Sequence, residues 1–168
     1  MILYFLACLI SLLFILVKGG LANRAGLDFL DVDVVAIITA YLLGRYGQVG
    51  AGLFAFAQGL VIDVYSAGLV GLFTLLYLVS FLGMLFGVRF FDPKSPKGIF
   101  ILVALAVLLK EVSLLIILDL FSYEMILSPS VFLYVAASAL SSGLIAPFFC
   151  YIFKRLGNAL TNGVEEPV

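Results

Sequence analysis

Histidine is absent from the 168 residues, and charged side chains make up only 11% of them. The missing imidazole removes the usual general base and the commonest metal ligand from any mechanism. Both cysteines, Cys8 and Cys150, lie in apolar runs, so the sequence offers neither a disulfide framework nor a metal-ligand spacing. Nine Lys and Arg against ten Asp and Glu leave no clustered basic face of the kind that binds nucleic acid.

Signatures of catalysis are also missing from the sequence. The chain has no GxxxxGK[ST] phosphate-binding loop and no G-x-S-x-G nucleophile turn. A serine nucleophile would have no histidine to activate it, which argues against an intramembrane serine protease or metalloprotease. The sequence therefore predicts a protein that is not an enzyme and needs no cofactor or metal.

Apolar residues dominate what remains. They make up 65% of the chain, and the mean hydropathy is +1.30. Soluble domains run near ~45–50% apolar and ~25% charged residues. Water-facing polar surface cannot cover such a composition, so the chain is predicted to be an integral membrane protein.

Six apolar segments can be marked as candidate spans. A transmembrane helix needs about 20 apolar residues, with ~17 as the lower limit. The second and third segments are marginal because Asp31, Asp33 and Asp63 intrude and only RYGQ separates them. One helix over 29–65 would be over ~50 Å long, which favours a helical hairpin. The prediction is an all-α, six-helix transmembrane bundle in a single domain, 1–168, with spans at 1–17, 29–46, 48–65, 67–88, 98–121 and 130–153.

The distribution of Lys and Arg between the loops predicts the orientation. With six spans, one side collects Arg45, Arg89, Lys94, Lys97, Lys154 and Arg155, whereas the other has only Lys18 and Arg24. Loops rich in Lys and Arg stay in the cytoplasm. Both termini are therefore expected to be cytoplasmic. The first segment lacks a basic start and exceeds a typical signal core, so we expect it to be kept as a membrane anchor.

The stretch GAGLFAFAQGLVIDVYSAGLVG, residues 50–71, combines glycines with one aspartate in an apolar run. Small residues at helical spacing let another helix backbone approach closely, and a carboxylate beside them should face protein rather than lipid. The neighbour could belong to this chain or to a partner. Gly68 and Gly71 are expected to form the turn that follows. On a helix, one stripe holds Gln48, Gly52, Ala55, Phe56, Gly59, Asp63 and Ser66.

This pattern resembles the central signature of the rod shape-determining protein MreD family. The residues that carry the resemblance are Gly50, Gly52, Gly59, Asp63, Ser66, Gly68 and Gly71. The C-terminal SSGLIAPFFCYIFKRL is similar to the family's last helix, with Gly143 and Pro147 followed by Lys154 and Arg155. Pro147 is expected to kink this helix. The resemblance covers roughly residues 28–156, although FLDVDV stands where the family often has proline before the second helix.

The resemblance implies a fold similar to the substrate-binding S-components of energy-coupling-factor transporters. It implies a non-enzymatic partner of MreC in the elongation complex of the bacterial inner membrane, surrounded by lipid. That complex also includes the MreB filament, RodA and a class B penicillin-binding protein, which the chain would meet indirectly. The alternative is an S-component-like subunit that binds a vitamin or another small molecule for transport.

Charged residues inside apolar segments are the remaining candidates. Lys110 and Glu111 lie at the middle of the fifth segment, where neighbours in sequence point about 100° apart and do not face each other. Each is expected to face the bundle, with a partner elsewhere, either in an interhelical ion pair or polar cavity or toward a ligand. Asp28, Asp31 and Asp33 could form an acidic metal cluster, but carboxylates at a helix start more simply complement the helix dipole.

The orientation can be checked with topology reporters. Fusions at residue 168 and within the loop 90–98 should both report a cytoplasmic location, because six of the loop cations listed above fall on that side. A periplasmic signal at either position would rule out the six-span topology.

Overall fold

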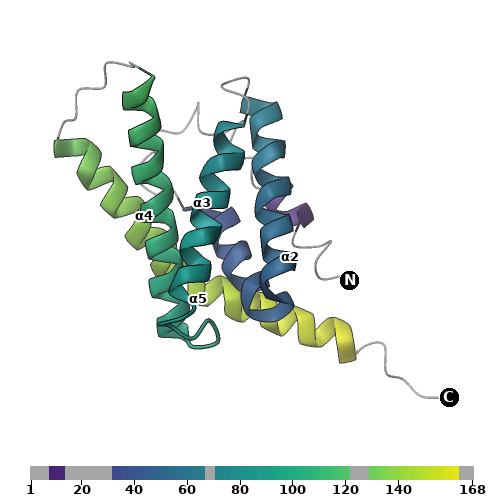
Figure 1. Cartoon of the computed structure of the whole chain (residues 1–168). Coiled ribbons are helices and arrows are strands. Elements are labelled where there is room, and N and C mark those ends of the chain that lie inside the picture. The colour runs from purple at the N-terminus through teal and green to yellow at the C-terminus, as the bar shows by residue number, and fades with distance from the viewer. Residues whose placement is uncertain (1–7, 14–31, 67–70, 122–128, 163–168) are drawn as a thin grey trace.

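The computed structural model describes residues 8–13, 32–66, 71–121 and 129–162 (Figure 1). Residues 8–13 are helical. Four further helices follow, and the described residues include no strand. The all-helical prediction is therefore confirmed for this part of the chain. The helices are α2 (Val34–Ser66), α3 (Leu72–Gly87), α4 (Pro96–Leu120) and α5 (Pro129–Asn162).

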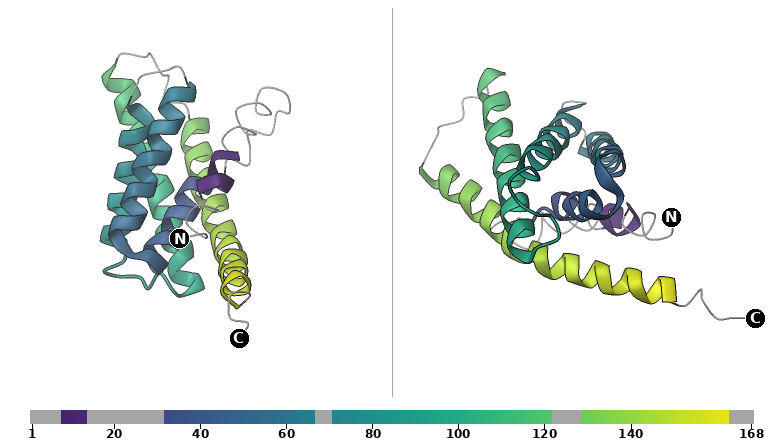
Figure 2. Two further views of the ribbon diagram at one scale, coloured as in Figure 1. Left: turned by 90° about the vertical axis from the view of Figure 1, so that its right-hand side faces the viewer. Right: turned by 60° about the horizontal axis from the view of Figure 1, so that its bottom comes forward.

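Helix α2 is broken at Gly47. This residue has φ 79° and ψ −173°, a conformation that is essentially restricted to glycine. The chain reverses there, and the second arm, 48–66, rises beside the first arm, 34–46 (Figures 1 and 2). The hairpin predicted from the RYGQ sequence is confirmed, because Gly47 is the third residue of that tetrapeptide.

The first arm forms the centre of the molecule. All ten residues from Val34 to Leu43 are buried, which is the burial expected of a helix that is apolar on every side. Helix α2 as a whole packs along α3, α3 packs along α4, and α4 packs along α5. The first arm, which belongs to the segment 29–46 that looked marginal as a membrane span, is thus the most deeply enclosed part of the described chain.

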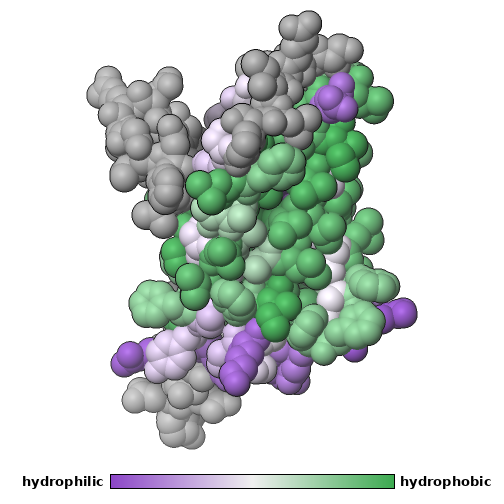
Figure 3. All heavy atoms as spheres, turned by 90° about the vertical axis from the view of Figure 1, so that its left-hand side faces the viewer, coloured by the Kyte–Doolittle hydropathy of each residue, from purple (hydrophilic) through white to green (hydrophobic). Residues whose placement is uncertain are grey.

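Within the described residues, three helices are long and apolar enough to cross a membrane: Val34–Ser66, Pro96–Leu120 and Ser130–Arg155. The first is the helix broken at Gly47, so it is not one straight span. Helix α3 is a shorter apolar helix. Figure 3 shows a broad apolar belt on one face, with hydrophilic side chains gathered mostly at the lower end. These features are compatible with a membrane protein, in agreement with the composition.

The polar break predicted at 90–98 begins between α3 and α4, but its last three residues already belong to α4, which starts at Pro96. Helix α5 remains helical through Pro147, and its ribbon bends along its length (Figure 1). Close packing against α4 occurs at Gly143, where a β-carbon would lie 3.0 Å from the Ala104 β-carbon and 3.1 Å from the Phe100 carbonyl oxygen. Gly143 therefore fixes how closely α5 approaches α4.

The turn at Gly47 gives a stability prediction with an internal control. Gly47→Ala should lower the free energy of unfolding by ~1–3 kcal/mol, because a side chain is strained at this φ and ψ. Gly44→Ala should leave it nearly unchanged, since a β-carbon there would meet only Pro93, at 3.6 and 3.7 Å. Thermal unfolding in mild detergent would compare the two variants. Equal melting temperatures would contradict a glycine-only turn.

Candidate functional site

Asp33 lies at the buried N-terminus of α2. Its Oδ1 accepts a hydrogen bond from the Ala36 amide at 3.0 Å, so the carboxylate caps the helix in the usual way. Its own backbone amide donates to Ser142 Oγ of α5, also at 3.0 Å. The start of the first arm is thus fixed to α5 by a hydrogen bond inside the bundle.

Lys110 of α4 supplies the counter-charge. Its Nζ lies 2.6 Å from Asp33 Oδ2 and 3.0 Å from Glu111 Oε1. The same ammonium lies 5.6 Å from the centroid of the Tyr77 ring of α3, which is within reach of a cation–π interaction. The Tyr77 hydroxyl donates to Asp33 Oδ1 at 3.4 Å. One cation and two carboxylates therefore join α2, α3 and α4.

The structure confirms part of what the sequence predicted for these charges. Lys110 and Glu111 contribute to the bundle interior, and Lys110 has the partner on another helix that was expected. The prediction that Lys110 and Glu111 do not pair was wrong, because a lysine chain is long enough to turn back toward its neighbour's carboxylate. Asp33 does serve the helix N-terminus, but its ion pair was missed. Asp28 and Asp31 lie outside the described residues.

Asp63 caps a second helix N-terminus, across the seam between α2 and α3. Its Oδ1 accepts the Phe73 amide at 2.8 Å. Its Oδ2 accepts both the amide and the hydroxyl of Thr74, at 3.0 and 2.5 Å. The residue at the cap position of α3, Gly71, has φ 93° and provides no side-chain cap. A carboxylate from the neighbouring helix therefore satisfies donors that α3 itself leaves open.

The glycines of the second arm let α3 approach. A β-carbon at Gly59 would lie 2.5 Å from Thr74 Cα, and one at Gly52 would lie 2.9 Å from the Phe81 ring. Within this chain, the stripe predicted around these glycines is therefore covered by α3. The stripe is narrower than predicted, because Phe56 is 42% exposed and Ser66 is exposed. Ser66 Oγ donates to the Asp63 carbonyl at 3.4 Å.

The predicted turn after the stripe is present at Gly71, which has a positive φ. Gly68 lies outside the described residues. A further polar contact was missed: Ser11 Oγ donates to Gln58 Oε1 at 3.1 Å, with both side chains buried. The glutamine inside an apolar arm could have predicted this contact, because such a polar group needs a partner in the protein interior.

The described residues contain no group of three or more Cys, Asp or Glu side chains arranged to hold a metal ion. Where Asp33 and Glu111 come together, the Lys110 ammonium already occupies the position between them. Cys8 and Cys150 are both free. The chemistry that these clusters support is helix-to-helix attachment by charge and hydrogen bond.

No protein-family model, no curated protein and no solved structure matches the chain. Its function is therefore to be inferred from the residues and contacts described above.

The ion pair gives a prediction in which a second substitution partly restores the stability that the first one removes. Lys110→Leu should lower the free energy of unfolding by ~3–5 kcal/mol, because it leaves two carboxylates without a cation in the interior. Asp33→Asn combined with Lys110→Leu should recover part of that loss, since asparagine still caps the helix and one charge is gone. Thermal unfolding and membrane yield would measure both.

Lys97→Leu is the matched control, because Lys97 is an exposed lysine on the same helix. If Lys110→Leu melts like the wild type and like this control, the Lys110 charge contributes nothing to the bundle.

Proposed function

We propose that this chain is a non-enzymatic scaffold of the MreD type. It would sit in the bacterial inner membrane as a six-helix bundle resembling an S-component, with both termini in the cytoplasm. It would bind the single membrane helix of MreC and support rod shape and lateral peptidoglycan synthesis. MreB, RodA and the class B penicillin-binding protein would be reached through MreC.

The observation that carries the proposal is the joint role of the MreD-like residues. Gly59 admits the backbone of α3, Asp63 caps that helix, and Gly71 forms the turn before it. A glycine, an aspartate and a further glycine at this spacing are thus explained by one contact between α2 and α3. Three of the residues that carry the resemblance thus act together in the fold, which supports the proposal.

The engagement of Lys110 favours the scaffold over the transport alternative. A subunit that binds a small molecule near Lys110 or Glu111 would need one of these charges to face its ligand. Here the ammonium is held by Asp33 and Glu111 and lies over Tyr77. The Lys110 cation is thus paired within the chain on both sides, which favours a structural role for the cluster.

The outer face of the second arm is where we place the partner helix. Because α3 covers Gly52 and Gly59, a partner cannot reach these glycines without moving it. A neighbouring face of the same arm, about 90° around the helix from these glycines, carries apolar residues at helical spacing. Their side chains are between 42% and 86% exposed, and they are Val49, Leu53, Phe56, Leu60 and Val64.

Co-expression with MreC and capture in mild detergent would test the proposal. Leu53→Ala with Leu60→Ala should reduce MreC capture about tenfold, equivalent to ~1.4 kcal/mol, because van der Waals packing drives helix association in lipid. The control pair, Leu140→Ala with Leu144→Ala, truncates similarly exposed leucines on α5 and should capture MreC normally.

Several outcomes would contradict this. A wild-type chain that captures no MreC would overturn the proposal, and capture of transporter ATPase subunits would support the alternative. Gly59→Leu should lower membrane yield, because its side chain would collide with Thr74. A well-folded Gly59→Leu protein that no longer captures MreC would indicate that MreC binds at the glycine stripe instead.

A further inference from the structure

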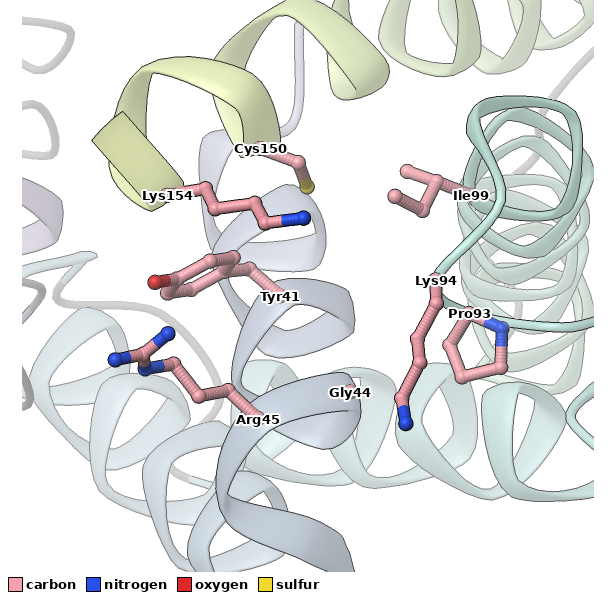
Figure 4. Close-up of a pocket in the computed structure, with 8 residues that line it drawn as sticks. All are labelled: Tyr41, Gly44, Arg45, Pro93, Lys94, Ile99, Cys150 and Lys154. Atoms are coloured by element: carbon pink, nitrogen blue, oxygen red, sulfur yellow. The ribbon is translucent and has the colours of Figure 1, made fainter. Parts of the chain in front are cut away.

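A pocket lies at the end of the molecule where the loop cations gather. It has a volume of about 240 Å³ and is bounded by the first arm of α2, the loop before α4, the start of α4 and the C-terminal half of α5 (Figure 4). Tyr41 and Cys150, both buried, form part of its apolar lining. The pocket is thus built from segments that are far apart in sequence.

Three cations surround this pocket, each from a different segment: Arg45, Lys94 and Lys154. No acidic residue is among the lining residues. Among the described residues, none of the three cations forms an ion pair with a carboxylate. The nearby Asp92 accepts a hydrogen bond from the backbone amide of Lys94 at 2.9 Å. The charge of the residues that line the pocket is therefore positive.

The side chains differ in how they are placed. Figure 4 shows the Lys154 amine reaching into the pocket beside the Cys150 sulfur, whereas Arg45 and Lys94 point away from its middle. All three residues are exposed, and their long side chains can swing without disturbing the backbone. Lys154 is thus already in place for an anionic group, and the other two can close on it from the rim.

We propose that this pocket binds the phosphate headgroup of an anionic membrane phospholipid. Basic pockets between membrane helices on the cytoplasmic side are suited to such headgroups. The apolar lining from Tyr41, Ile99 and Cys150 gives the glycerol and upper acyl chains a surface that free phosphate would not use. This site rests on the membrane location proposed above but not on MreC, because its residues lie on the first arm, the loop, the start of α4 and α5.

Native mass spectrometry of the purified full chain, titrated with phosphatidylglycerol or phosphatidylcholine, would test the proposal without any partner. Phosphatidylglycerol should be retained preferentially. Arg45→Gln with Lys154→Gln should weaken its binding about fivefold for each cation removed. The control, Arg89→Gln with Lys97→Gln, removes two exposed cations that do not line the pocket and should leave binding close to the wild type.

A second pair of variants separates the pocket from surface charge. Gly44 lines the pocket, and a β-carbon there has room. Gly44→Leu should therefore fill the space and weaken lipid binding with every cation retained, whereas Gly44→Ala should not. Melting temperatures would confirm that each variant is folded.

The following results would overturn the proposed lipid site. Equal loss from both cation pairs, or no preference for phosphatidylglycerol over phosphatidylcholine, would reduce the effect to diffuse surface attraction and overturn the proposal. Inorganic phosphate alone that binds as tightly as the lipid would identify a free-phosphate site instead.

Discussion

The carboxylate of Asp33 and its backbone amide connect the four described helices α2, α3, α4 and α5. Asp33 caps its own helix α2, accepts a bond from Tyr77 of α3, pairs with Lys110 of α4 and donates to Ser142 of α5. In a lipid-surrounded bundle, buried polar groups have to find their partners within the protein. One aspartate therefore fixes the relative positions of four apolar helices that could otherwise slide along one another.

Asp63 shows the same principle at a second place. In both cases a carboxylate meets the amide donors at a helix N-terminus, where the helix dipole favours negative charge. Asp33 caps the helix that it begins, whereas Asp63 reaches across to a neighbouring helix. The difference follows from the glycines, because Gly59 brings α3 close enough for the aspartate one turn further on to reach Phe73 and Thr74. Few charges suffice to order this bundle because each one has several partners.

Much of this arrangement could be predicted from the sequence. The interruption at RYGQ indicated the hairpin, and the isolated charges at Lys110 and Asp63 had to face protein. Which carboxylate would pair with Lys110 could not be predicted, because Asp33 is 77 residues away and its position is fixed by tertiary packing. Helical spacing placed Phe56 near Gly59 but could not show where α3 would stop covering the arm. The pocket around Lys154 could not be predicted either, because its cations come from three segments and each one looks like an ordinary loop charge in the sequence.

The distance between Asp33 and Lys110 along the chain has a consequence for biosynthesis. Asp33 is synthesised 77 residues before Lys110, so the aspartate exists for a time without its cation. A carboxylate buried in an apolar interior without a partner is costly. The first arm cannot reach its final, enclosed position until α4 has been made, because α4 carries the cation that pairs with Asp33. Assembly of the bundle is therefore completed late in translation, when the second charge neutralises the first.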